Sequence, residues 1–246
     1  MNVVYFISRK WSADILKETI KSKKLLNLKL KIYTTHNKFI DQKYFKNYKI
    51  KLIKENNLKK YIQEIRKFNP TFICAFGWSG YLNKQLRNIA PCLILHPSKL
   101  PKFRGGSPIQ NQLIRGLKVS AITILLADEK IDSGNILFQK KISFDGYLDD
   151  IHERIVNAGI IGLDKIIHKF KKRTLITYKQ NHKKATIYKR RTPLMSEILI
   201  NDFKKHNAKY FYNLVRGLQK PYPECFIKCK DNSILYLQRV SLKKSQ

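Results

Sequence analysis

Two titratable residues in the middle of the chain, His96 and Asp132, lie in contexts that suit acid–base chemistry. His96 follows an apolar run, residues 92–95, and enters a stretch rich in proline with two adjacent glycines. Such a stretch cannot continue as a helix or a strand, so we expect an ordered loop that holds the histidine. Asp132 follows a second apolar run, residues 121–127. A carboxylate orients an imidazole and supports its charge, while the imidazole takes a proton from a nucleophile or stabilises an oxyanion.

The expected positions of these two residues favour a shared site. Each lies just past the C-terminal end of a predicted strand, and ligand sites of open α/β sheets form at that edge. We therefore predict that His96 and Asp132 meet at the rim of a sheet. The simpler alternatives are a structural histidine after a buried strand and an aspartate that only forms the turn before Ser133 and Gly134.

Alternating strand and helix patterns surround the two residues. Strands are predicted at residues 1–8, 28–34, 49–53, 71–76, 92–95, 121–127 and 136–142. Helices are predicted at residues 13–26, with Ser12 as the N-cap, and at 58–68, 82–88, 108–115 and 149–170. This alternation predicts an α/β fold, Rossmann-like, with a mostly parallel sheet.

The pattern changes after residue 174, where a basic, turn-like stretch begins. It is followed by a predicted helix, residues 203–218, and by a β-hairpin of residues 225–230 and 234–240. We therefore predict an N-terminal α/β catalytic domain, residues 1–180, and a C-terminal helix and β-hairpin region, residues 181–246. The hairpin is a candidate contact for a homodimer, which we expect.

Composition narrows the class of protein. The chain has no apolar run near the roughly 20 residues that span a bilayer, and its N-terminus is typical of a first strand, not of a signal peptide. Four scattered cysteines favour reduced thiols over a disulfide framework or a zinc cluster. We expect a cytoplasmic protein with no membrane contact and no metal site. The net charge of +33 permits nucleic-acid binding, but lysines are spread over every segment, so nucleic acid is not expected as the main ligand.

The run HPSKLPKFRGGSPIQ, followed by an aspartate in DEKIDSGNIL, resembles the folate-dependent formyltransferases. The residues that fit that family's pattern are His96, Ser98, Leu100, Pro101, Arg104, Gly105, Pro108, Asp132 and Gly134. The resemblance implies transfer of a formyl group from 10-formyltetrahydrofolate, as co-substrate, to an amine. It also implies that His96 and Asp132 are catalytic.

Ile94 departs from the family pattern, which has an asparagine two residues before the histidine. That asparagine donates a hydrogen bond to the developing oxyanion, and the loss of one such donor costs about 10²–10³ in rate. We expect another donor to replace it: His96 itself, a backbone N–H of the loop, Gln110 or Asn111. The alternative is a weak or altered enzyme.

Further site residues are expected on either side of the pair. The folate is predicted to contact Phe76, Gly77, Trp78, Ile131 and Asp132, although Trp78 is equally typical of a core tryptophan. The predicted substrate-binding residues are Ser98, Lys102, Arg104, Gly105, Gly106, Ser107, Arg190, Arg191 and Tyr222. Exposed amides of the glycine-rich loop, next to a helix N-terminus, favour an anion, whereas the simpler interpretation is a basic surface loop.

The C-terminal stretches TIYKRRTPLMSEI and YNLVRGLQKPYPECF resemble the nucleotide-sugar N-formyltransferases. The residues that fit are Tyr188, Arg191, Pro193, Arg216, Pro221, Tyr222, Pro223 and Phe226. The resemblance implies an amino-dideoxysugar acceptor, dTDP-linked in this branch, and a role in lipopolysaccharide or O-antigen biosynthesis. One alternative is a methionyl-tRNA formyltransferase, which the charge suits although the chain is short. Another, motivated by Ile94, is a non-catalytic relative that binds a nucleotide sugar or RNA.

Overall fold

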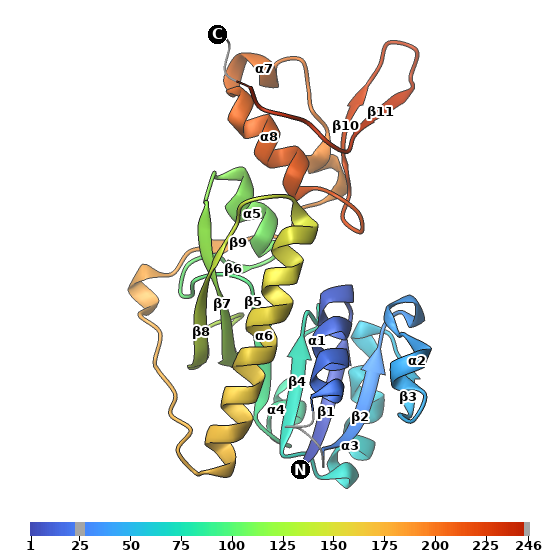
Figure 1. Cartoon of the computed structure of the whole chain (residues 1–246), viewed down its shortest axis with the longest axis vertical. Helices are drawn as coiled ribbons and strands as arrows, with labels where there is room; N and C mark the ends of the chain where they lie inside the picture. Colours follow the sequence, from blue (N-terminus) through green and yellow to red (C-terminus); the bar gives the residue numbers. More distant parts are fainter. Residues whose placement is uncertain (23–27, 244–246) are drawn as a thin grey trace.

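The computed structural model describes residues 1–22 and 28–243 (Figure 1). Its described residues contain a seven-stranded sheet with the strand order β3-β2-β1-β4-β5-β7-β8. The strands are β1 Asn2–Ile7, β2 Lys29–Thr34, β3 Ile50–Leu52, β4 Phe72–Phe76, β5 Cys92–His96, β7 Val119–Leu126 and β8 Ile136–Ser143. The first five strands of this order, β3, β2, β1, β4 and β5, are parallel to one another. The predicted α/β fold with a mostly parallel sheet is therefore confirmed.

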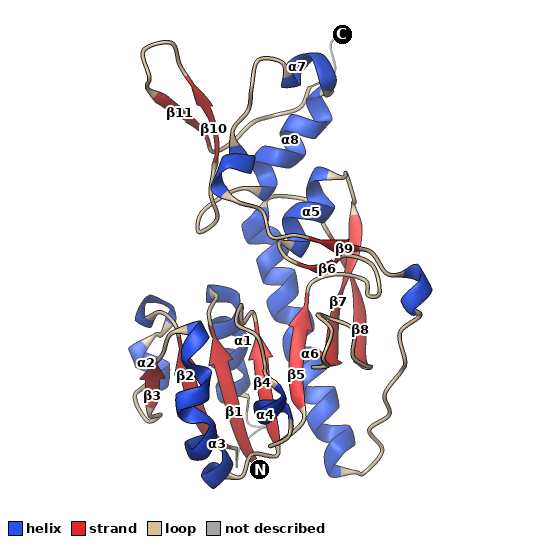
Figure 2. Ribbon diagram, turned by 180° about the vertical axis from the view of Figure 1, so that it is seen from behind, coloured by secondary structure: helices blue, strands red, loops and turns tan. Residues whose placement is uncertain are grey.

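Helices cover both faces of the sheet (Figure 2). The helices are α1 Lys10–Lys21, α2 Gln42–Phe45, α3 Ile62–Phe68, α4 Lys84–Arg87, α5 Pro108–Ile114, α6 Leu148–Lys171, α7 Asp202–Lys205 and α8 Ala208–Gly217. Alternate side chains of a strand point to opposite faces. Accordingly, Tyr5 of β1 packs with α1 and α6, whereas its neighbour Phe6 packs with α3 and α4.

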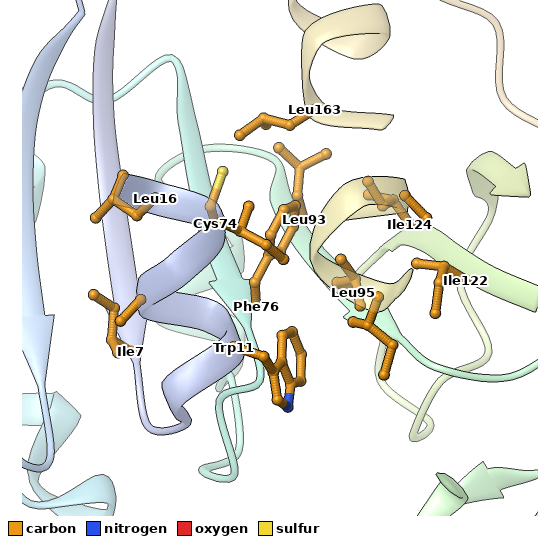
Figure 3. Packing of buried hydrophobic residues seen from close by; sticks show 14 of the residues in the cluster. Ile7, Trp11, Leu16, Cys74, Phe76, Leu93, Leu95, Ile122, Ile124 and Leu163 are labelled. Atoms are coloured by element: carbon orange, nitrogen blue, oxygen red, sulfur yellow. The ribbon is translucent and has the colours of Figure 1, made fainter. Parts of the chain in front are cut away.

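The larger core lies between the sheet and the pair of helices α1 and α6. Figure 3 shows Leu93 and Leu95 of β5 beside Ile122 and Ile124 of β7, with Leu163 of α6 close by. All five side chains are at most 3% exposed. This core fixes the strand that ends in His96 and the strand that precedes Asp132.

The direction of β7 corrects one expectation about the site. β7 is antiparallel to β5, with Leu126 opposite Leu93 and Thr123 opposite His96. The C-terminal ends of the two strands therefore lie at opposite ends of their shared ladder, and the expectation that both site residues follow strand ends at one rim is wrong. Asp132 instead belongs to a loop that turns back, because the N–H of Leu126 donates to the carbonyl of Asn135.

Several helix boundaries differ from those predicted. Ser12 lies buried inside α1, which begins two residues earlier, so it is not the N-cap. The predicted helix 58–68 begins as a 3-10 helix, Glu55–Tyr61, before α3. The predicted helix 203–218 is split into α7 and α8 because the Asn207 side chain caps the backbone N–H of Tyr210. The predicted end of the first helix lies outside the described residues.

The chain after α6 returns to the sheet before it forms the C-terminal region (Figure 1). A short strand, β9 Ile187–Tyr188, pairs in parallel with β6 Arg104–Gly105. Helix α8 and the hairpin of β10 Cys225–Lys228 and β11 Ile234–Leu237 follow, with a small core of their own. That core contains Ile198, Leu214, Val215, Leu218 and Cys225. A division of the chain after residue 180 stays a prediction.

Among the described helices, none combines the length and the apolar character needed to cross a lipid bilayer. The expected compartment stays a prediction.

Candidate active site

His96 and Asp132 are in contact despite the antiparallel course of β7. The Nδ1 atom of His96 lies 3.4 Å from Oδ2 of Asp132, and both side chains are less than a tenth exposed. The other ring nitrogen, Nε2, lies 2.7 Å from the carbonyl oxygen of Phe103. A carbonyl oxygen can only accept, so Nε2 carries a proton and Nδ1 is the nitrogen that faces the carboxylate. A proton taken up at Nδ1 would therefore be held against Asp132, which supports the charge of the ring.

One short segment, residues 103–105, holds both members of the pair. Phe103 accepts from His96 as described, and the N–H of Gly105 donates to Asp132 Oδ2 over 2.8 Å. Thr186 in turn holds this segment, because its Oγ1 accepts from the N–H of Phe103 and its carbonyl accepts from the N–H of Arg104, both over 2.8 Å. The geometry of the pair thus depends on a residue more than fifty positions further along the chain.

A buried polar network supports the backbone of the Asp132 loop. Asp132 has a φ of +52°, in the left-handed region that non-glycine residues rarely adopt. The Nε2 of Gln180 donates to the carbonyls of Asp132 (2.9 Å) and Gly134 (2.7 Å). The Oε1 of Gln180 accepts from Nη2 of Arg104 over 2.7 Å. Gln180 therefore stabilises the loop conformation that presents the Asp132 carboxylate.

Arg104 is buried within this network. The same Nη2 lies 3.1 Å from Nδ1 of His182, and because a guanidinium only donates, that nitrogen accepts. Burial lowers the pKa of the Arg104 guanidinium, and the charge of Asp132 opposes that change. The predicted contact of Arg104 with a substrate is therefore wrong, because its side chain is engaged inside the fold.

The glycine pair 105–106 makes room for β9 and does not form a free anion cradle. A Cβ on Gly105 would lie 2.4 Å from the carbonyl oxygen of Tyr188, and one on Gly106 would lie 2.4 Å from the backbone of Arg190. The Gly105 N–H donates to Asp132, and the Gly106 N–H donates to Tyr188 over 2.8 Å. Both glycine amides are occupied and cannot bind an anion, so an anion site on this loop stays a prediction only for the N-terminus of α5.

His96 and Asp132 both line a cleft of about 830 Å³. This volume falls within the about 300–1,000 Å³ typical of small-molecule sites. The predicted folate residues Gly77, Trp78, Ile131 and Asp132 line it. The predicted substrate residues Gly105, Gly106, Ser107, Arg190, Arg191 and Tyr222 line it as well.

Three further predicted contacts do not reach the cleft. Phe76 is fully buried in the core and packs edge-on against Tyr5, because alternation along β4 points it to the face that α1 and α6 cover. Ser98 is buried, and its Oγ donates to the carbonyl of Lys102 over 2.7 Å. The Lys102 side chain is exposed and is not among the residues that line the cleft. These three residues shape the fold or its surface and are not ligand contacts.

Several residues that line the cleft were not predicted from the sequence. Arg9 follows β1, and His36, Lys38 and Phe39 follow β2. The ends of parallel strands converge at one sheet edge, so residues just past β1 and β2 carried a usable signal. Lys130 and Lys189 also line the cleft, which gives it a predominantly basic rim.

Residues 4–161 match the model of the family described as formyl transferase. The chain belongs to this family. The predicted family resemblance is therefore confirmed and, at the level of the family, so are the transferase class and the formyl-tetrahydrofolate co-substrate.

Individual formyl transferases that resemble the chain include methionyl-tRNA formyltransferases. The methionyl-tRNA formyltransferase of Caldanaerobacter subterraneus subsp. tengcongensis is 30% identical over 184 residues, which cover 72% of this chain and 58% of that protein. The solved methionyl-tRNA formyltransferase from Clostridium thermocellum is 27% identical, with a TM-score of 0.76, and the match covers 99% of this chain and 94% of that one. The aligned region spans little more than half the length of the curated relatives.

The sugar branch of the formyl transferases matches in fold but less well in sequence. A 4-N formyltransferase from Francisella tularensis has a TM-score of 0.77 over 99% of this chain and 98% of its own, but only 18% identity. Further curated relatives named methionyl-tRNA formyltransferase are 28–32% identical. The prediction of a nucleotide-sugar acceptor, with its role in lipopolysaccharide or O-antigen synthesis, is therefore wrong. The C-terminal motif that suggested it is too short to outweigh similarity over most of the chain.

Proposed function

We propose that this chain transfers a formyl group from 10-formyltetrahydrofolate to the amine of methionyl-tRNA. The observation that carries this proposal is the His96–Asp132 pair, which opens onto a ligand-sized cleft with a basic rim. The pair supplies proton transfer, the cleft accommodates a folate, and the rim suits an anionic acceptor.

The reaction that the pair would serve is an acyl transfer. The lone pair of the amine nitrogen forms a bond to the formyl carbon, and the bond from that carbon to N10 of the folate breaks. The amine loses one proton and N10 gains one, so the products are an N-formyl amine and tetrahydrofolate. Nδ1 of His96, beside Asp132 Oδ2, is placed to hold a proton between these two events.

The cleft also suits the folate itself. Trp78 lies against Phe6, with ring centroids 5.0 Å apart, and its indole Nε1 is buried with no hydrogen-bond partner in the described structure. Tyr81 and Ile131 line the same cleft and remain largely exposed. A flat heterocycle with polar edges would cover these apolar surfaces and satisfy an unpaired donor. Lys38 and Lys130 would face the anionic end of such a ligand.

A nucleic-acid acceptor agrees with the charge of the chain. The net charge is +33, and Lys189, Arg190 and Arg191 line the cleft on the side of the C-terminal region. Cations that contact phosphates supply much of the affinity of a protein for a nucleic acid. The expectation that nucleic acid is not the main ligand therefore loses its support, since the curated relatives are named for a tRNA substrate. A homodimer stays a prediction.

The test is a direct comparison of acceptors. The purified chain would be incubated with 10-formyltetrahydrofolate and either methionyl-tRNA or dTDP-4-amino-4,6-dideoxyglucose, and the products would be analysed by mass spectrometry. We expect a mass gain of one formyl group on the methionyl amine and none on the sugar. The proposal is overturned if methionyl-tRNA stays unmodified while the enzyme binds the folate.

A further inference from the structure

Gln110 carries a buried side-chain amide nitrogen that the fold leaves unpaired. Its side chain is 2% exposed, and its Nε2 has no hydrogen-bond partner in the described structure. The residue lines the same cleft as His96 and Asp132. A buried N–H without an acceptor is destabilising, so its presence in a native fold calls for an explanation.

The two residues that follow Gln110 show how such amides are normally satisfied. Nδ2 of Asn111 donates to the carbonyl of Gly106 over 2.9 Å. Nε2 of Gln112 donates to the carbonyls of Pro97 and Pro108, each over 2.8 Å. Among the side-chain amide nitrogens of these three successive residues in α5, only that of Gln110 remains available to a ligand in the described structure.

Several other donors near the catalytic pair are already engaged. Nε2 of His96 binds the Phe103 carbonyl, and the N–H of Gly105 binds Asp132. Asn111 is likewise occupied, and Ile94, which also lines the cleft, has no polar side-chain atom. An oxyanion that forms in this cleft therefore needs a donor that these groups do not provide.

We propose that Gln110 is a catalytic residue whose Nε2–H donates to the formyl oxygen; this inference rests on the proposed formyl transfer. When the amine nitrogen bonds to the formyl carbon, the π pair of the carbonyl moves onto oxygen, and the hydrogen bond from Gln110 stabilises the charge. The pair returns to the carbonyl as the bond to N10 breaks. The amine proton passes to His96 and then to N10, so charge and atoms balance.

The test replaces Gln110 by methionine, which keeps the length of the side chain and removes its amide. We expect Gln110→Met to lower kcat by about 10²–10³, the usual loss for one oxyanion donor, while KM for the acceptor changes less than about twofold. We also expect its Tm to rise by about 2–4 °C, because an unpaired buried donor is gone. The matched control, Gln112→Met, removes an amide that is fully bonded and should lower Tm.

A binding measurement tests the same contact without turnover. We expect 10-formyl-5,8-dideazafolate to raise the Tm of the wild-type protein more than 5,8-dideazafolate, which lacks the formyl oxygen. In Gln110→Met the two compounds should give equal shifts. Since no acceptor is present, this result does not depend on whether methionyl-tRNA is the substrate.

Each of three results would overturn the assignment. A fall in both Tm and kcat for Gln110→Met would mean that the residue is structural. A raised acceptor KM with unchanged kcat would place its amide on the acceptor instead. Equal shifts by the two folate analogues in the wild-type protein would show that the formyl oxygen has no donor there. Absence of transfer to methionyl-tRNA, with the analogue difference intact, would refute only the proposed function.

Discussion

Gly105 donates its backbone N–H to the same oxygen of Asp132 that faces the imidazole of His96. The carboxylate is thus fixed between a backbone amide at 2.8 Å and a ring nitrogen at 3.4 Å. A charge held by a rigid amide has little freedom to turn away from the histidine. The pair is therefore organised before any ligand arrives, which is the condition for efficient electrostatic stabilisation.

Replacing Asp132 by asparagine should abolish most turnover. The asparagine side chain would keep the shape of the carboxylate but could not stabilise a charged imidazole, so we expect kcat to fall by about 10³–10⁴. Single-turnover formyl transfer measures this. Asp231→Asn, in the exposed hairpin turn, serves as the control and should keep full activity. Wild-type turnover in Asp132→Asn would remove the carboxylate from the mechanism.

Replacing Gln180 by methionine should misplace Asp132 without touching the ligand. The variant loses both bonds to the loop carbonyls and the bond to Arg104, so Asp132 relaxes from its left-handed conformation. A displacement near 1 Å costs up to about 100-fold in rate, and we expect a kcat loss of that order with little change in KM. Gln219→Met, which removes one exposed bond to the Gln238 carbonyl, is the matched control. Equal kcat in the two variants would contradict the role of Gln180.

Gly105→Ala and Gly116→Ala separate backbone strain from steric clash. Both glycines have positive φ, +91° and +76°, so alanine is strained at either position. A Cβ at Gly105 would meet the Tyr188 carbonyl at 2.4 Å, whereas at Gly116 the nearest atom lies at 3.7 Å. Backbone strain alone lowers stability by about 1–2 kcal/mol. We expect Gly105→Ala to lower stability by more than this and to lose activity, because the clash adds to the strain. Circular dichroism melting curves measure the difference; similar Tm values would show that β9 can move aside.

His152 should make the fold sensitive to mild acid. Burial lowers its pKa to about 4, against smaller opposing effects of Asp149 and Asp14, and its Nε2 has no partner in the described structure. The unfolded chain takes up this proton near the ordinary pKa of about 6.5, so between about pH 6.5 and 4 the unfolded state binds more protons. Stability therefore falls as the pH falls through this window, by at most about 3 kcal/mol.

The corresponding measurement is urea unfolding at several pH values. His152→Leu should lose less stability than the wild type between pH 6.5 and pH 4. This window is bounded by the ordinary pKa of about 6.5 and the lowered pKa of about 4. His168→Leu, at an exposed position near the end of the same helix, should leave the slope as in the wild type. Parallel slopes in all three proteins would mean that folding does not lower the pKa of His152.

An asparagine at position 94 should compensate for the loss of the Gln110 amide. Ile94 lines the cleft, so Ile94→Asn would bring a second N–H donor to it. We expect this substitution to raise kcat about tenfold or more in the Gln110→Met background and to have a smaller effect in the wild type, since coupled donors are not additive. Equal fold-changes in both backgrounds would indicate that the two positions act independently.

The sequence predicted the site where chemistry and local pattern coincide. His96 and Asp132 are of types that suit acid–base chemistry and lie beside strands that periodicity reveals, so their contact could be predicted without a structure, while their catalytic role stays a prediction. Gln180 could not, since its bonds reach Asp132 across 48 positions and no local pattern marks such a contact. The direction of β7 was equally hidden, because an apolar run has the same pattern in either orientation.

The family motif contains both residues that face the cleft and residues that hold the fold together. Arg104 and Ser98 fit the formyltransferase pattern as well as His96 does, yet both are engaged inside the protein. A motif records which residues a fold requires, and only coordinates show which of them face a ligand. The same limit explains why Phe76 was assigned to the folate although its ring belongs to the core.

The pairing of β6 with β9 has a consequence for synthesis on the ribosome. A nascent chain that ends at residue 161, where the family match ends, already contains His96 and Asp132 but lacks the partners Gln180 and Thr186. The observed geometry of the His96–Asp132 pair can therefore be completed only after translation has passed Tyr188 and that segment has left the exit tunnel. A prematurely terminated product would thus retain both reactive groups without the geometry that makes them useful.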